Sequence, residues 1–360
     1  MSDEDLLKAI RTRIDQIDGK LQELITERAR CALEVARLKH ASGDMDYYRP
    51  EREAQVLQTV LGRNQGPLED EVVARLFREI MSACLALQRP IAVAYLGPEG
   101  NFTEAAVFKH FGQAVSARPL AAIDEVFRDV EAGAVDYGVV PIENSSEGAV
   151  DHTLDMFMSS PLKICSEIEL RIHHNLMGKA DGTGAINRVY AHQMALAQCR
   201  EWLNAHLSGV ECIPVSSNAE AARRAQEEAG AAAIAGANAA AIYGLEILSS
   251  NIEDKPDNTT RFLVIGRKIP APSGRDKTSL LVSTSNKPGA LYRLLKPLAE
   301  HGISMSRIES RPSRREMWEY VFFIDIEGHA QDEKVAAVIR ILDNEAAVLK
   351  VLGSYPCAVL

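Results

Sequence analysis

A long run of apolar residues at heptad spacing most restricts how this chain can fold. The positions follow one another in steps of three and four: Leu7, Ile10, Ile14, Ile17, Leu21, Leu24, then Arg28, then Cys31, Val35 and Leu38. Such a seam predicts one continuous helix. At about 1.5 Å per residue the helix exceeds ~45 Å, which a ~90-residue unit cannot cover by itself. We therefore expect a second copy of the chain to pack against it, giving a homodimer or a larger assembly.

Arg28 is the one charged member of the seam, and an arginine there costs stability unless an anion or a carboxylate meets it. Lys39 lies close to three full turns further on and shares its face. Arg11 lies about 25 Å before Arg28 along the axis and on another face, so it can reach the same anion only from a second chain. Two interpretations stay open: an anion site shared by two chains, or an Arg28 that sets the register and pairs with a carboxylate.

Three segments with different periodicities divide the chain. Helical patterns over 50–61 and 68–88 complete an all-helical segment, residues 1–90. Short apolar runs alternating with helical windows predict an α/β domain over 91–268, and a linker with two prolines and a glycine follows over 268–277. Residues 278–360 read strand, helix, two strands, helix, strand, which is the βαββαβ order of an α+β ferredoxin-like domain.

Composition narrows the class of partner. The chain has 40 Lys+Arg against 50 Asp+Glu, a net charge of −10, and no dense basic run, so nucleic acid is not an expected partner. The acidic start lacks an export signal, and the alanine-rich stretch 229–245 reads as a buried strand and a packed helix, not a membrane span. Six scattered cysteines without a C-x-x-C pair indicate neither a zinc site nor a disulfide framework. We expect a cytoplasmic protein without metal or organic cofactor.

Motifs throughout the helical segment carry a family resemblance. They are Leu-Leu-x-x-Ile-Arg11, Glu27-Arg28, Glu34-Val35 to Lys39, Arg-Pro-Glu51-Arg-Glu, and Arg75-Leu-Phe to Gln88. The segment resembles the all-helical chorismate mutases. These isomerases rearrange chorismate to prephenate without a covalent catalyst, so their site needs cations that fold a dicarboxylate and stabilise charge on an ether oxygen.

The resemblance assigns roles to six residues of this site. It implies that Arg28 and the Arg11 of a partner chain bind the carboxylates, that Lys39 and Gln88 face the ether oxygen, that Glu51 accepts from the ring hydroxyl, and that Cys84 lines the pocket. Two features depart from the usual pattern: Cys84 stands where serine is common, and the 43–50 loop has shifted spacing.

Polar loops next to strands carry a second resemblance. They include Gly97-Pro-Glu-Gly100, Pro141-Ile-Glu-Asn144-Ser145, Leu-x-Ile-x-His174, Ala-His192 with Gln198-Cys199, and Thr260-Arg261-Phe262. Each alone is equally compatible with turn chemistry. Together they resemble prephenate dehydratase, a lyase with two α/β lobes like those of periplasmic binding proteins.

That resemblance implies how the second site works. Thr260 is the candidate donor to the leaving hydroxyl, Asn144 and Gln198 orient the substrate, Arg261 holds a carboxylate and Ser145 contributes to binding. Whether Thr260 protonates or only orients stays open. His174 reads as a structural residue, and His173 would point to the opposite face of a strand, which argues against paired metal ligation.

The last segment resembles a phenylalanine-binding ACT domain. The resemblance rests on two motifs whose residues we expect to bind the effector: Gly289, Ala290 and Leu291, and Glu309, Ser310, Arg311 and Pro312. Gly289 lets backbone approach a ligand at a helix start, where N–H groups suit a carboxylate. The alternative is a domain that only holds the dimer together.

The order of the segments supports one reading. The product of the first segment is the substrate of the second, and the third would sense the end product. We expect a bifunctional enzyme of phenylalanine biosynthesis that is inhibited by L-phenylalanine. Two alternatives are a dehydratase that prefers arogenate, and a ligand-sensing protein whose lobes bind without turnover.

Overall fold

The computed structural model describes residues 2–43, 47–146, 148–179, 186–284, 287–312 and 320–360. Three helices come first: α1 (Asp3–Ser42), α2 (Pro50–Arg63) and α3 (Asp70–Ala86). Ser2 begins α1 through a capping box with Asp5, and Gly43 ends it in the left-handed conformation. The predicted all-helical segment is confirmed.

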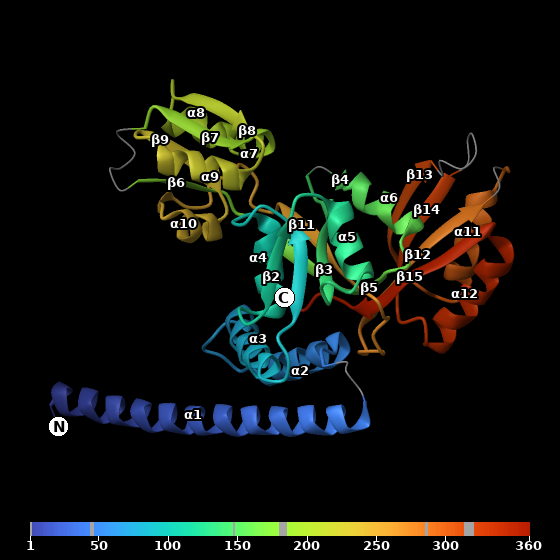
Figure 1. Ribbon diagram of the computed structural model, residues 1–360, viewed down its shortest axis with the longest axis horizontal. Coiled ribbons are helices and arrows are strands. Elements are labelled where there is room, and N and C mark those ends of the chain that lie inside the picture. Colours follow the sequence, from blue (N-terminus) through green and yellow to red (C-terminus); the bar gives the residue numbers. More distant parts are fainter. Residues whose placement is uncertain (1, 44–46, 147, 180–185, 285–286, 313–319) are drawn as a thin grey trace.

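Helix α1 presents its heptad seam to solvent. None of its residues is buried, and Ile10, Leu24 and Leu38 are 56%, 61% and 72% exposed. Helices α2 and α3 pack on each other and α3 contacts α1, while much of α1 extends beyond them (Figure 1). An exposed apolar seam of this length is typical of an interface that another chain covers.

The first α/β lobe holds one half of a long sheet. Its strands are β1 (Ala92–Leu96), β2 (Ser116–Leu120), β3 (Tyr137–Asn144), the short β4 (Gly148–Ala149), β5 (Lys163–Arg171) and β11 (Thr259–Gly266). Helices α4 (Phe102–Phe111), α5 (Ile123–Glu131) and α6 (Asp151–Ser159) complete the lobe. Phe127 and Phe157 are fully buried in its core and meet edge to face at 5.2 Å.

The second lobe is a separate five-stranded sheet in the order β10-β6-β9-β7-β8. Its strands are β6 (Asn175–Gly178), β7 (Arg188–His192), β8 (Glu211–Val215), β9 (Ala231–Ala235) and β10 (Glu246–Ser249). Its helices are α7 (Gln193–Gln198), α8 (Arg200–His206), α9 (Asn218–Glu227) and α10 (Ala237–Tyr243). The stretch 229–245 is therefore a buried strand and a packed helix, as predicted.

The last domain has the predicted βαββαβ order. It consists of β12 (Asp276–Thr284), α11 (Ala290–Glu300), β13 (Met305–Pro312), β14 (Tyr320–Glu327), α12 (Glu333–Glu345) and β15 (Val348–Pro356). Its strand order β13-β14-β12-β15 continues through β5 into the first lobe, and β15 and β5 are in register at Gly353 and Ile164. A Cβ at Gly353 would lie 2.3 Å from the Ile164 carbonyl oxygen, so this close approach requires glycine.

Among the residues described, no helix is both long and apolar enough to cross a membrane.

Candidate active sites

Two chain segments cross between the lobes and position the first candidate site. Residues 172–174 enter the second lobe and residues 252–258 return from it. The crossings are joined by backbone hydrogen bonds from Ile172 to Asn258 (2.8 Å) and from Ile252 to His174 (2.8 Å). The end of β3, the start of β11 and the end of α7 meet at this lobe junction.

Asn144 and Thr260 lie side by side at the junction. They are register partners on β3 and β11, and Asn144 Nδ2 donates to Thr260 Oγ1 at 2.8 Å and to Asn258 Oδ1 at 3.0 Å. The Ser146 N–H donates to Asn144 Oδ1 at 2.9 Å, which fixes the orientation of the amide. Because Thr260 Oγ1 accepts from Asn144, the Thr260 hydroxyl hydrogen can be donated to another group.

Gln198 joins the same cluster from the second lobe. Its Oε1 accepts from Asn258 Nδ2 at 3.2 Å and lies 2.7 Å from His174 Nε2. Burial lowers the pKa of His174, so its imidazole is neutral near pH 7 and donates from Nε2. His174 therefore orients Gln198.

Asn258 was not among the predicted site residues, yet it is the centre of this cluster. It is 3% exposed and touches Asn144 and Gln198 with its two amide ends. Ser145 Oγ accepts from the Thr259 N–H at 2.9 Å, so that hydroxyl also supports the turn. The sequence signal that could have identified Asn258 is its place in the Asn258-Thr259-Thr260 run directly before a strand.

The Gly97–Gly100 loop already holds a carboxylate of the chain itself. Asn101 caps α4 by accepting from the Glu104 N–H, and Glu104 Oε2 accepts from the Gly100 N–H at 2.8 Å. Tyr243 of the second lobe donates to the Glu99 carbonyl at 3.1 Å. This loop thus joins the lobes, and Glu104 accepts from its backbone at the start of α4.

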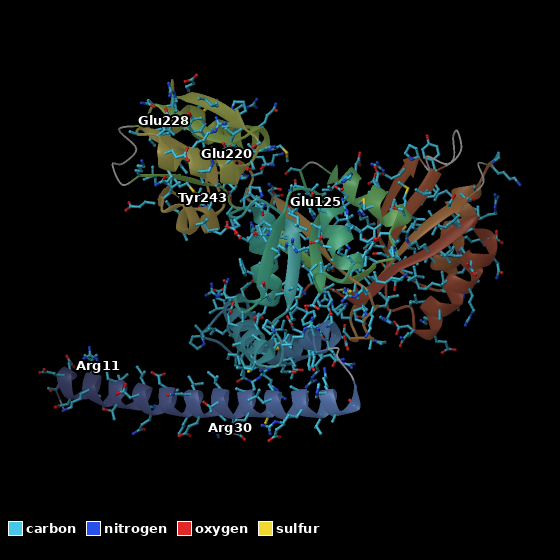
Figure 2. The ribbon with its side chains drawn as sticks, viewed as in Figure 1. Arg11, Arg30, Glu125, Glu220, Glu228 and Tyr243 are labelled. Carbon is cyan, nitrogen blue, oxygen red and sulfur yellow. The ribbon has the colours of Figure 1, made fainter. Side chains whose placement is uncertain are left out.

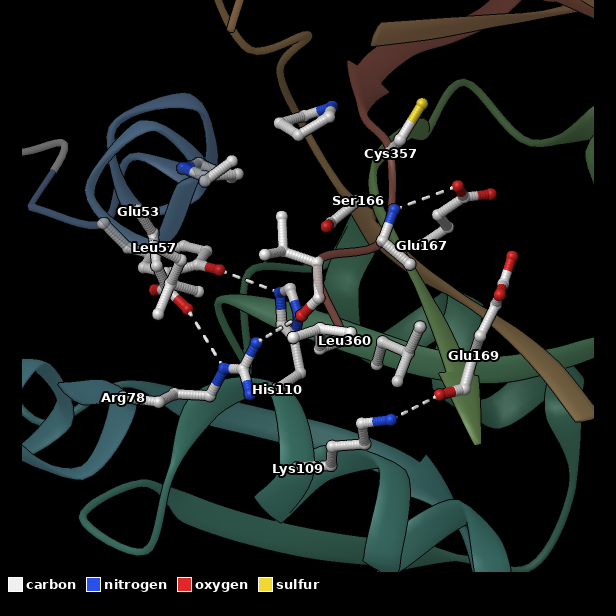
Figure 3. A pocket seen from close by; sticks show the side chains of 17 residues that line it. Glu53, Leu57, Arg78, Lys109, His110, Ser166, Glu167, Glu169, Cys357 and Leu360 are labelled. Carbon is white, nitrogen blue, oxygen red and sulfur yellow. Dashed lines mark hydrogen bonds and ion pairs between the residues drawn. The ribbon is translucent and has the colours of Figure 1, made fainter. Parts of the chain in front are cut away.

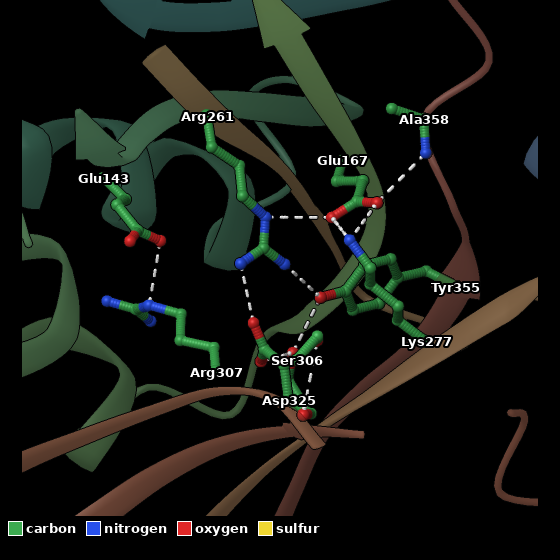
Figure 4. A network of polar contacts seen from close by, with 10 residues as sticks. Glu143, Glu167, Arg261, Lys277, Ser306, Arg307, Asp325, Tyr355 and Ala358 are labelled. Carbon is green, nitrogen blue, oxygen red and sulfur yellow. Dashed lines mark hydrogen bonds and ion pairs between the residues drawn. The ribbon is translucent and has the colours of Figure 1, made fainter. Parts of the chain in front are cut away.

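Arg261 lies apart from the other predicted residues of the dehydratase site. Its guanidinium donates to Glu167 Oε2 at 2.9 Å, to Asp325 Oδ2 at 2.6 Å and to the Tyr355 hydroxyl at 3.0 Å (Figure 4). Burial would lower the pKa of Arg261, but Tyr355 and the carboxylates of Asp325 and Glu167 raise it overall. Adjacent strand residues face opposite sides, so Arg261 points away from Thr260 and binds protein carboxylates, not a ligand in the cluster.

The predicted mutase residues are distributed over all three helices. Arg28 and Lys39 are half-buried on α1, Glu51 is half-buried near the start of α2, and Cys84 is buried near the end of α3. The Gln88 Oε1, just after α3, is buried without a hydrogen-bond partner among the described residues. An unpaired buried acceptor of this kind is typical of a site that a ligand or partner completes.

Arg11 lies apart from these residues. Figure 2 shows it toward the free N-terminal end of α1, away from α2 and α3. The seventeen residues to Arg28 span about 25 Å of straight helix. Within one chain Arg11 cannot join Arg28, as the sequence predicts.

A polar pocket that the sequence did not predict joins the mutase-like helices to the C-terminus. Arg78 on α3 is 8% exposed, donates to the Val359 carbonyl at 2.9 Å and lies 3.8 Å from Glu53 of α2 (Figure 3). Burial raises the pKa of Glu53 to about 7, although Arg78 and a hydrogen bond from Tyr48 oppose the shift. The four residues after β15 thus reach back to the first domain.

The predicted effector residues occupy two places in the last domain. Gly289, Ala290 and Leu291 line a cavity of about 260 Å³ at the start of α11, with Tyr320 and Phe322. Ser310 and Pro312 are the β13 register partners of Phe322 and Tyr320, and Glu309 pairs with Phe323.

Arg311 faces the first lobe of the predicted dehydratase domain. Its guanidinium pairs with Asp151 and, at 2.9 Å, with Asp155, both on α6 of the first lobe. Two carboxylates of the same chain thus already pair with its charge.

Comparison with known proteins identifies each domain. The family models for chorismate mutase type II, prephenate dehydratase and the ACT domain match residues 10–89, 93–270 and 278–344. Bifunctional chorismate mutase/prephenate dehydratases of Stutzerimonas stutzeri and Pseudomonas aeruginosa are 57% and 58% identical to this chain, over the full length of each protein. The chain belongs to this bifunctional family.

A solved structure supports the same assignment for the second and third domains. A prephenate dehydratase from Arthrobacter aurescens in complex with L-Phe is 37% identical, with a TM-score of 0.69, over 74% of this chain and 90% of that one. The chain thus joins a chorismate mutase, a two-lobed prephenate dehydratase and an ACT domain, and both predicted activities follow from its family. No group of three or more His, Cys, Asp or Glu side chains in the described part of the chain is placed to hold a metal ion.

Proposed function

We propose that the cluster of Asn144, Thr260, Asn258 and Gln198 binds prephenate and promotes its conversion to phenylpyruvate. In this reaction the bond to the ring carboxylate breaks, its electron pair enters the ring, and the ring hydroxyl leaves with a proton as water. The observation that carries the proposal is the hydrogen bond from Asn144 to Thr260 Oγ1. Because the oxygen accepts this bond, the Thr260 hydroxyl hydrogen is available to be donated to the substrate. Gln198 supplies its amide NH₂ as a second donor, since its oxygen is already used.

The test is prephenate dehydration by full-length Asn144→Ala and Gln198→Ala. Loss of one positioned donor costs about 10²- to 10³-fold in kcat in related oxyanion sites, so each variant should fall by at least tenfold. Chorismate turnover in the same samples should stay within twofold of wild type. A wild-type rate of dehydration in both variants would mean that the cluster takes no part in the reaction.

The mutase site is proposed to form between two subunits. Arg28, Lys39, Glu51, Cys84 and Gln88 come from one chain, and Arg11 of the partner subunit completes it. The exposed seam of α1 and the length of that helix support this arrangement. Folding of chorismate needs positioned cations, and no covalent step, so a shared site can supply what the reaction requires.

The cavity at the start of α11 is the proposed site for L-phenylalanine. Gly289 adopts a positive φ of 75° and places the first N–H groups of α11 beside the cavity, and Tyr320 and Phe322 provide an apolar wall. The family and the L-Phe complex of the Arthrobacter relative support feedback inhibition by the end product. The cytoplasmic location stays a prediction from the sequence.

A further inference from the structure

The two strands that carry Asn144 and Thr260 are each tied to the ACT domain at the neighbouring residue. Thr260 pairs with Asn144 in the β11–β3 register, and the next pair is Arg261 with Glu143. Arg261 Nη1 donates to Asp325 Oδ2 at 2.6 Å, and Glu143 Oε2 lies 3.0 Å from Arg307 Nε. Side chains alternate along a strand, so one pair faces the substrate site and the adjacent pair faces the ACT domain.

The ACT side of this contact has the same construction. Arg307 on β13 and Asp325 on β14 are themselves register partners. Two ion pairs therefore join the dehydratase strands to the ACT strands (Figure 4). Glu143 of the dehydratase pairs with Arg307 of the ACT domain, and Arg261 of the dehydratase pairs with Asp325 of the ACT domain. We call Glu143, Arg261, Arg307 and Asp325 the four-residue contact.

Three of the four side chains in the four-residue contact are largely buried. The side chains of Arg261, Arg307 and Asp325 are 13%, 11% and 7% exposed, and only Glu143, at 40%, is more open. Ser279 also donates to Asp325 Oδ1, and Lys277 lies 2.8 Å from the Glu167 carboxylate that binds Arg261. Paired charges at low exposure interact more strongly than surface pairs and hold one geometry.

The sheet order shows how strands that are not neighbours come into contact here. Three strands, β12, β15 and β5, separate β14 from β11 in the sheet, yet their side chains touch. The sheet halves must bend toward each other, and between them lies the β15–β5 register pair at Gly353. A shift of the ACT strands would therefore reach Glu143 and Arg261 directly.

We propose that Glu143 and Arg261 are positioning residues, through which the ACT domain holds Asn144 and Thr260 in the geometry for dehydration. The inference rests on the proposed role of the Asn144–Thr260 cluster. On this inference, phenylalanine changes the activity of the dehydratase through the four-residue contact. Movement of β13 and β14 displaces the Glu143–Arg261 pair, and the adjacent Asn144–Thr260 pair moves with it.

The test uses the full-length protein with Glu143→Gln, Arg307→Gln and Asp325→Asn. Each should lower kcat for prephenate by roughly 3- to 30-fold while KM stays within about twofold. Phenylalanine should still bind, measured by calorimetry, but should inhibit less. The exchanged pair Glu143→Arg with Arg307→Glu rebuilds the ion pair and should recover a large part of kcat.

Lys350→Met is the matched control. Lys350 on β15 donates to the Phe157 carbonyl at 2.9 Å, so it ties the same two domains at a place that is not adjacent to Asn144 or Thr260. Its prephenate kcat should match wild type. Equal losses in Lys350→Met and the single variants, with no recovery in the exchanged pair, would overturn the proposal. Unchanged kcat and inhibition in the single variants would do so as well.

Amide hydrogen exchange separates this inference from the proposed function. Phenylalanine should change exchange in 137–144 and 259–266 of the wild type and leave it unchanged in Arg307→Gln. If the wild type shows this response without turning over prephenate, the proposed function is wrong, but the four-residue contact is still the route of the response to phenylalanine. If both proteins respond equally, the four-residue contact is not the route.

Discussion

Arg78 on α3 donates a hydrogen bond to the backbone carbonyl of Val359, which lies 281 positions later in the chain. The last residues of the ACT domain thereby rest on the mutase domain. On the way, the Ala358 N–H donates to Glu167 Oε1 at 3.0 Å, and Glu167 also binds Arg261. A continuous set of contacts thus runs from α3 through the C-terminal tail to the dehydratase strand that carries Thr260.

Arg78→Met should destabilise the junction of the mutase domain and the tail. The variant loses the bond to Val359 and leaves the Glu53 carboxylate without its cation, which together cost about 1 to 3 kcal/mol. Thermal unfolding should show a lower first transition. Arg75→Met, at an exposed position on the same helix, is the control and should unfold like the wild type. Equal midpoints for both variants would mean that the tail contact contributes nothing.

Glu53 should make the stability of this junction depend on pH. Its pKa is raised in the folded chain to about 7, so the folded state binds more protons than the unfolded state between the ordinary glutamate pKa and about 7. The contribution is therefore present at low pH and is lost as pH rises through about 7. Between pH 5 and 8 the free energy of unfolding of the wild type should fall by up to about 3 kcal/mol more than that of Glu53→Gln. Parallel curves of unfolding midpoint against pH for the two proteins would exclude this role for Glu53.

A shared mutase site can be tested by mixing two inactive variants. Arg11→Ala and Arg28→Ala should each lose chorismate turnover and keep prephenate dehydration. In a mixed dimer one site carries both substitutions and the other carries neither. Random exchange of equal amounts should therefore restore about a quarter of wild-type mutase activity.

The control for this experiment is Arg30→Ala, an exposed position two residues from Arg28 on α1. It should keep full mutase activity alone and in mixtures. No recovery on mixing Arg11→Ala with Arg28→Ala, despite verified subunit exchange, would contradict a mutase site that is shared between two subunits.

Thr260→Ala should reduce prephenate dehydration by about 10²-fold or more, because the leaving hydroxyl loses its donor. Thr260→Ser retains the hydroxyl and should keep most of the activity. Thr259→Ala changes the preceding residue, whose side chain faces the other side of the strand, and serves as the control. If Thr260→Ala dehydrates prephenate at the wild-type rate, the cluster needs another donor.

Features with local periodicity could be predicted from the sequence. The α1 seam repeats every three to four residues over ten apolar or charged positions, and the strands β9 and β11 are short apolar runs bounded by polar turns. Asn144, Gln198 and Thr260 could be selected because each belongs to a motif of the dehydratase family. The structure brings these three residues into one hydrogen-bonded cluster around Asn258.

Contacts between domains could not be predicted in the same way. Arg261 meets Asp325 and Glu167 at separations of 64 and 94 residues, and no local pattern marks either carboxylate as its partner. A motif shows that an arginine is needed next to Thr260, but not whether it faces a substrate or another domain. The Arg78–Val359 hydrogen bond could not be predicted from the sequence for the same reason.

The most direct test of the account measures both reactions of the purified chain, chorismate to prephenate and prephenate to phenylpyruvate, each with and without L-phenylalanine. We predict turnover of both substrates and suppression of dehydration by phenylalanine. Consumption of neither substrate while phenylalanine still binds would contradict it, and would make the protein a sensor built from the same three domains.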